Sequence, residues 1–201
     1  MAKSHDTSLK DILRDINNGT TQLPEFQRDW VWDDGHIKAL IASITCSYPV
    51  GAVMFLECGG TGIHFKSRMF TGAPDTGKVP EQLVLDGQQR LTSIYCAMYS
   101  RDPVHTQTAK KECIKRYYYL DIEKCLDPAV DRVDCIVAVP ADRQVKEDFG
   151  RHVILDLSAR QDEFKHHKFP LNIVFDSIAL DEWKDDYRDY HSDPGVSRRL
   201  R

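Results

Sequence analysis

The sequence lacks three features that mark large protein classes: long apolar runs, paired cysteines and an excess of basic residues. It has no stretch of about 18 apolar residues, so no membrane-spanning helix is expected. Met1 to Asp6 carry no apolar core of the signal-peptide kind, and a cytoplasmic location is therefore expected. The six cysteines include no C-x-x-C pair, so neither a zinc site nor a disulfide framework is indicated.

The formal net charge is −4, whereas proteins that bind duplex DNA usually carry a strong basic excess. Any contact with DNA must therefore come from a local patch. Two short basic clusters are present, and both are typical of solvated surface charge: Lys110, Lys111, Lys115 and Arg116, and Arg198, Arg199 and Arg201. The motifs of serine hydrolases, zinc proteases and histidine-rich nucleases are absent.

With 201 residues, 41% hydrophobic and 29% charged, the chain has the composition of an ordinary globular protein. This length suits one large domain or one domain with an appendage. We expect a domain over residues 1–190, followed by a linker-like tail over 191–201 that contains Asp193-Pro194-Gly195.

The hydrophobic spacing predicts a mixed α/β arrangement of the α+β class. Helices are expected from Ser8 to Gly19, from Asp33 or Asp34 to Tyr48, from Gln88 to Tyr99 and from Ser177 to Tyr190, the last with Trp183 and Tyr187 buried. Pro24 favours an extended segment over 22–28. Strands are expected at Val50–Leu56, which reads as buried, and at Ile63–Phe70, Gln82–Leu85, Lys115–Ile122, Val133–Val139, Val153–Leu157 and Leu171–Phe175.

The strand, turn and helix over 82–99 form the most informative segment. Gly87 allows a tight turn and the close approach of a ligand, and Gln88, Gln89 and Arg90 follow in the first helical turn. A helix start with unpaired N–H groups, an arginine fork and neutral amide donors predicts a phosphate site. Asp86 would hold Mg²⁺ there or clamp Arg90. An equally weighted alternative is that Asp86 only caps the helix and Arg90 pairs with a surface carboxylate.

A second polar pair, Gln27-Arg28, lies in the extended segment beside Phe26, Trp30 and Trp32. Taken alone, it is typical of a surface loop with aromatic anchors. Residues 60–67 also come within one position of a P-loop, but Phe65 stands where that motif needs glycine, so a hairpin is expected instead.

Three blocks together resemble a known family: Leu23 to Trp32, Ser43 to Gly51 ending in Tyr48-Pro49-Val50-Gly51, and Leu85 to Ser93. The family is the domain that opens the GmrSD type IV restriction endonucleases and the SspE phosphorothioate-dependent defence proteins. The resemblance is specific over residues 8–99 and looser to about residue 180. It implies a fold similar to ParB and sulfiredoxin, a small mixed sheet with surrounding helices.

The resemblance further implies a nucleoside triphosphatase that acts as a sensor and gates a separate nuclease domain. Gln27 and Arg28 match the first family motif, and Asp86 to Arg90 match the second. We expect the nucleotide phosphates to be bound by Gln27, Arg28, Gly87, Gln88, Gln89, Arg90 and Thr92. Catalysis is expected to depend on Asp86, Gln89 and Arg90, with Asp86 as the Mg²⁺ ligand.

Two other functions stay open at this point. The first is a non-catalytic reader of modified DNA, such as phosphorothioate DNA, in which Trp30, Trp32 and Tyr117 to Tyr119 stack on bases. The second is a nuclease in its own right, which lacks a metal-binding carboxylate cluster in the sequence. No His-Asn-His nuclease pattern is present, so a nuclease domain is expected to be fused in the full protein or supplied by a partner.

Overall fold

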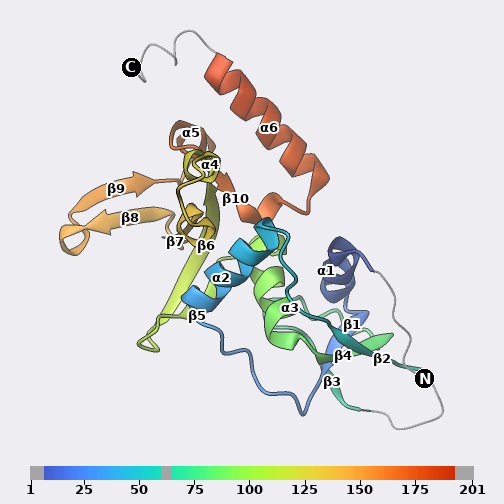
Figure 1. Ribbon diagram of the computed structural model, residues 1–201. Coiled ribbons are helices and arrows are strands. Elements are labelled where there is room, and N and C mark those ends of the chain that lie inside the picture. The colour runs from blue at the N-terminus through green and yellow to red at the C-terminus, as the bar shows by residue number, and fades with distance from the viewer. Residues whose placement is uncertain (1–6, 60–64, 193–201) are drawn as a thin grey trace.

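The computed structural model describes residues 7–59 and 65–192 (Figure 1). Its first unit is a four-stranded mixed sheet made of β1 (Thr21–Pro24), β2 (Met54–Glu57), β3 (Ser67–Arg68) and β4 (Gln82–Asp86). The strand order is β2-β4-β1-β3, and the central pair β1 and β4 is parallel. The carboxyl ends of these two strands therefore meet at one edge of the sheet.

Three helices enclose the main core with this sheet: α1 (Leu9–Asn18), α2 (Asp34–Thr45) and α3 (Gln88–Ile94). The apolar stripe of α1 is buried, and the helix ends at Gly19, whose φ of 77° is the left-handed value that glycine adopts freely. The Asp33 side chain caps α2 by accepting from the backbone N–H of His36 at 2.9 Å. The helix α3 continues as a π-helical turn, η1 (Tyr95–Tyr99).

A second, antiparallel sheet is built around β6 (Cys113–Asp121). The strands β5 (Val104–Gln107), β7 (Ile136–Pro140) and β10 (Lys168–Pro170) each pair with it. The helical turns α4 (Ile122–Leu126) and η2 (Arg132–Cys135) connect β6 to β7, and the turn η4 (Leu171–Ile173) follows β10. This sheet supplies Val104, Tyr118 and Ile136 to the main core, so the two sheets share one hydrophobic interior.

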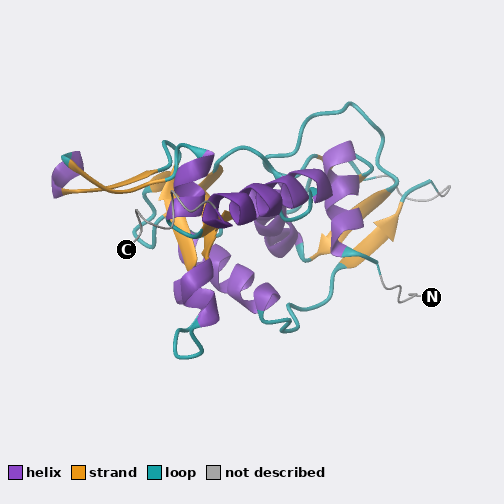
Figure 2. Cartoon of the chain, turned by 90° about the horizontal axis from the view of Figure 1, so that it is seen from above, coloured by secondary structure: helices purple, strands orange, loops and turns teal. Residues whose placement is uncertain are grey.

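Two features extend outward from this body. The hairpin of β8 (Gln144–Glu147), η3 (Asp148–Gly150) and β9 (His152–Asp156) projects from one side as a narrow ribbon (Figure 2). The long helix α6 (Ser177–Ser192) packs on α5 (Arg160–Lys165) through an aromatic cluster. In that cluster Phe164 contacts Trp183 edge to face, with ring centroids 5.3 Å apart.

The α+β class with a mixed sheet is confirmed, as is the passage from a strand at 82–85 through Gly87 into a helix that runs to Tyr99. The helices predicted near 9–18, 34–45 and 177–190 are also found. No helix among the residues that the structure describes is long and apolar enough to cross a membrane. The tail predicted from residue 191 lies outside the described residues from 193 onward, and so do residues 60–64 of the predicted hairpin.

Four strand predictions are wrong, one of them wholly and three in part. The strand expected over Val50–Leu56 begins only at Met54 and lies at the sheet edge, where Met54 is 59% exposed. The segment Leu171–Phe175 contains no strand and forms the turn η4 instead. The turn η2 replaces the start of the strand predicted at Val133. Of the strand predicted at Ile63–Phe70, only Ser67–Arg68 is a strand among the described residues 65–70. Short apolar runs of this kind bury side chains equally well in a strand or in a helical turn.

Candidate functional site

The two predicted motifs line one cavity of about 400 Å³ at the carboxyl edge of β1 and β4. It is lined by Phe26, Gln27, Arg28, Trp32, Leu85, Asp86, Gly87, Gln88, Gln89 and Arg90. The topology explains this proximity, because Gln27-Arg28 lies in the turn that follows β1 and Asp86-Gly87 lies at the end of β4. Of the predicted site residues, only Thr92 does not line this cavity.

The glutamines join the two motifs to each other. Gln27 Nε2 donates to the carbonyl oxygens of Val84 and Leu85, at 2.7 and 2.9 Å. From the other side, Gln88 Nε2 donates to the carbonyl of Arg28 at 2.8 Å. The amide donors predicted for phosphates are therefore engaged with backbone carbonyls, and they fix the shape of the cavity.

Gln89 is engaged at both ends of its amide. Its Nε2 donates to the carbonyl of Asp29 at 3.0 Å, and its Oε1 accepts from the backbone N–H of Val31 at 3.0 Å. The same segment is held further on, where Trp30 Nε1 donates to Ser93 Oγ at 3.0 Å. The chain from Asp29 to Val31 is therefore tied to α3 by side chains of α3 itself.

Arg90 clamps a third segment. Its guanidinium donates to the carbonyls of Val50 and Ala52 and lies 3.3 Å from Asp86 Oδ2. Gly51 makes this contact possible, because its φ is +91° and a Cβ there would lie 1.9 Å from Arg90 Nη1. The clamp between Asp86 and Arg90 that the sequence allows is present, and most of the Arg90 side chain is buried beneath it.

Two charged side chains of the cavity remain exposed and available to a ligand. Arg28 is exposed, and no carboxylate lies within ion-pair distance of it among the described residues. The Asp86 side chain is 72% exposed and uses one oxygen toward Arg90. The cavity thus offers one uncommitted guanidinium and one accessible carboxylate, with the start of α3 between them.

The carboxylate suits a shared magnesium ion but not a site made of protein alone. Mg²⁺ is commonly held by one or two carboxylates together with substrate phosphates and water, and Asp86 can supply one carboxylate. Within residues 7–59 and 65–192, no three His, Cys, Asp or Glu residues are grouped so as to hold a metal ion. Asp86 therefore fits Mg²⁺ only if a phosphate ligand completes its coordination.

Thr92 and Arg68 have places in the structure that differ from those expected from the sequence. Thr92 was expected to bind phosphate, but it is fully buried, and its hydroxyl has no hydrogen-bond partner among the described residues. Arg68 on β3 gave no signal in the sequence, yet its Nη2 donates to the carbonyls of Gln27 and Arg28, both at 3.1 Å. A lone arginine in a predicted hairpin has no pattern by which to identify this role.

Comparison with known proteins gives two matches. The family described as "GmrSD restriction endonuclease, N-terminal domain" matches residues 9–192. The uncharacterized protein MJ0686 of Methanocaldococcus jannaschii is 33% identical over 137 residues, which cover 65% of this chain and 23% of that protein. The match thus spans less than a quarter of the relative's length, while the family match includes every residue of the cavity.

Proposed function

Because the chain belongs to the family of GmrSD restriction endonuclease N-terminal domains, we propose that it binds and hydrolyses a nucleoside triphosphate as the sensor module of a restriction system. The DNA it responds to would be modified, and a nuclease domain, fused or supplied by a partner, would carry out cleavage. One observation carries the proposal: two motifs about 60 residues apart line one cavity, with an exposed arginine and an exposed carboxylate at its mouth.

Arg28 is the residue we assign to the phosphates. Its guanidinium is exposed, while its own carbonyl is held by Gln88 and Arg68, so the backbone beneath the charge is fixed. A guanidinium can stabilise the charge of a transferring phosphoryl group, and here it would extend from a fixed point of the backbone. Unpaired backbone N–H groups in the first turn of α3 would add further donors beside it.

Asp86 is assigned to the metal or to the attacking water. When bound, Mg²⁺ would neutralise part of the phosphate charge. Gln89 and Arg90, expected from the sequence to be catalytic, are engaged with backbone groups, and we assign them positioning roles instead. The similarity to the ParB and sulfiredoxin fold stays a prediction, and none of these residue roles depends on it.

A non-catalytic reader of modified DNA is the second candidate. A cavity of about 380 Å³ lies between Trp30, Val31 and Trp32 on one side and β5 and β6 on the other, which favours an aromatic contact with a base. Tyr118 and Tyr119 do not add to it, since both are buried in the core.

The test measures phosphate release from ATP, GTP, CTP and UTP with Mg²⁺, with and without DNA, and triphosphate binding by calorimetry. Arg28→Ala should weaken binding about tenfold or more, as expected for the loss of a charge-assisted hydrogen bond. Asp86→Asn should reduce turnover more than binding. The matched control is Arg14→Ala, which removes an exposed arginine of α1 that lies outside the cavity. If the wild type binds no triphosphate, the DNA-reading function replaces this one.

A further inference from the structure

A second cavity, of about 700 Å³, shares no lining residue with the candidate phosphate site. It lies between α1, the π-helical turn η1, and the segment that joins η4 to α6. Its volume is in the range of small-molecule sites, about 300–1,000 Å³. Neither predicted motif contributes a residue to its lining.

A pair of tyrosines forms its aromatic wall. The wide turn at η1, closed by the bond from the backbone N–H of Ser100 to the carbonyl of Tyr95 at 2.8 Å, places Tyr99 over Tyr95. Their rings stack with centroids 5.5 Å apart and planes 24° apart. The Tyr95 hydroxyl donates to Asn17 Oδ1 at 2.8 Å, so α1 fixes the pair in place. Isolated π-helical turns often occur at functional sites.

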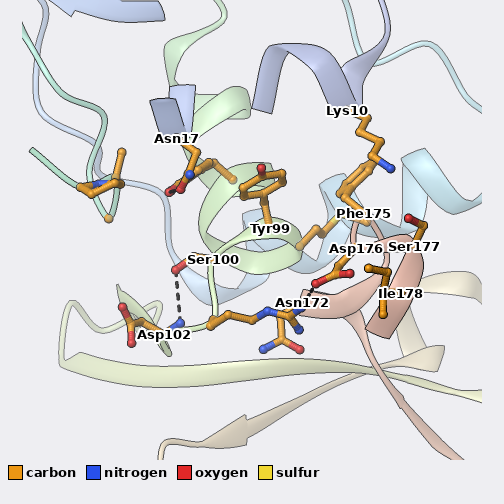
Figure 3. A pocket seen from close by; sticks show the side chains of 16 residues that line it. Lys10, Asn17, Tyr99, Ser100, Asp102, Asn172, Phe175, Asp176, Ser177 and Ile178 are labelled. Carbon is orange, nitrogen blue, oxygen red and sulfur yellow. Dashed lines mark hydrogen bonds and ion pairs between the residues drawn. The ribbon is translucent and has the colours of Figure 1, made fainter. Parts of the chain in front are cut away.

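Figure 3 shows Tyr99 standing between Asn17 on one side and Phe175 on the other. Tyr99 is only half-buried, unlike Tyr95, which is 2% exposed. The ring of Tyr99 therefore faces the cavity, while Tyr95 supports it from the core. A flat aromatic ligand can lie against such a wall.

The charges are divided between the two ends of the cavity. Lys10 lies at the end beside Phe175, and Asp102 lies at the opposite end (Figure 3). Arg101 and Asp176 neutralise each other through an ion pair of 2.5 Å. Among the described residues, Lys10 and Asp102 take part in no ion pair, so one cation and one carboxylate remain for a ligand.

We propose that this cavity binds a nucleotide unit whose base carries an exocyclic amino group, with cytidine as the reference case. The base would stack on Tyr99. Its amino group would donate to Asp102, since a carboxylate is a natural acceptor for cytosine N4–H₂. The phosphate would pair with Lys10. The proposal does not depend on triphosphate binding at the Arg28 site.

The experiment titrates the whole chain by calorimetry with cytidine monophosphate, uridine monophosphate and a short single-stranded oligodeoxycytidylate. Uridine lacks the amino group, so it should bind about tenfold more weakly than cytidine. Lys10→Ala should weaken cytidine monophosphate about tenfold, whereas Arg14→Ala, one turn along the same helix, should change nothing. Asp102→Asn should remove the preference for cytidine over uridine.

Tyr99→Leu should weaken both monophosphates equally, and thermal melting will show whether that variant stays folded. Binding of the monophosphate with these variant effects supports a free nucleotide as ligand. Binding of the oligonucleotide alone, with the same effects, supports a nucleotide within a strand. Equal affinity for cytidine and uridine, or no binding of any of the three probes, overturns the proposal. Arg28→Ala should leave the cytidine affinity unchanged, which separates this test from that of the triphosphate site.

Discussion

The guanidinium of Arg90 lines the candidate cavity and at the same time holds the loop that carries Val50 and Ala52. The wall of the cavity and the support of this loop therefore depend on the same side chain. Arg28, by contrast, contributes an exposed charge whose backbone is supported by other residues. A substitution of Arg90 should therefore change the stability of the protein as well as the cavity, whereas a substitution of Arg28 should change mainly the charge of the cavity.

Arg90→Ala should lower the free energy of unfolding by about 1–3 kcal/mol, because two carbonyls lose their charged donor. Arg90→Lys should recover only part of this, since one compact ammonium group does not reproduce a planar fork. Denaturant unfolding measures both variants. If Arg90→Ala unfolds like the wild type and loses only triphosphate affinity, the positioning role is wrong.

Gly51→Ala should destabilise the protein more than Gly150→Ala. Both glycines have nearly the same positive φ, +91° and +88°, so the backbone strain is matched. A Cβ at residue 51 would also collide with Arg90, whereas at residue 150 nothing lies within 4 Å. The difference in melting temperature between the two variants isolates that collision. Equal melting temperatures would show that the Arg90 side chain can move aside without a loss of stability.

At the residue scale, the sequence predicted Asp86 to Arg90 as a unit because turn, helix start and arginine follow one another within five positions. It could not tell which donors face a ligand and which face the backbone, because that depends on neighbours brought in by folding. Arg68 and Thr92 show the two resulting errors, a missed support and a residue assigned to the cavity that is buried instead.

At the element scale, predictions worked where the hydrophobic period was long, as in α1, α2 and α6. They failed in short, mostly apolar runs, because Leu171 and Ile173 are buried from a helical turn as fully as they would be from a strand. The parallel pairing of β1 with β4, which creates the site, has no local signal at all.

The residues on which α6 packs include a histidine, His167, that should make the stability of the protein depend on pH. His167 Nδ1 lies 2.7 Å from the Tyr187 hydroxyl, and its ring stacks on His191 at 4.7 Å. Burial lowers the pKa of His167 below its usual 6.5; nearby His191 and Lys168 reinforce this, and Glu123 opposes it. The unfolded chain therefore binds this proton more readily, so stability is lost as pH falls below about 6.5.

Replacing His167 should reduce that loss. His167→Asn is the suitable variant, because the residue has a φ of +52° and asparagine tolerates the left-handed region. The drop in melting temperature from pH 7.5 to pH 5.5 should be smaller than in the wild type. His105→Asn, at an exposed position on β5, should keep the wild-type slope. A variant slope equal to that of the wild type would remove His167 from this explanation.

At the scale of the whole molecule, the purified chain should cut no DNA. Metal-dependent nucleases need several ligands around their ions, and the described residues hold no such group. Supercoiled plasmid incubated with the chain and Mg²⁺ or Mn²⁺ should stay supercoiled, with and without triphosphate. Nicking by the wild type that disappears in Asp86→Asn would show instead that the cavity itself is a nuclease site.

The glutamine bonds that join the two motifs of the candidate site link residues 57 to 60 positions apart in the chain. Contacts of such long sequence separation slow folding, because the intervening loop must close before they can form. A synthetic peptide over 82–99 would thus reproduce the motif without the cavity. During synthesis, the candidate site would first form only after Arg90 has left the ribosome and β4 has paired with β1, so the cavity and the mixed sheet should form in the same kinetic step.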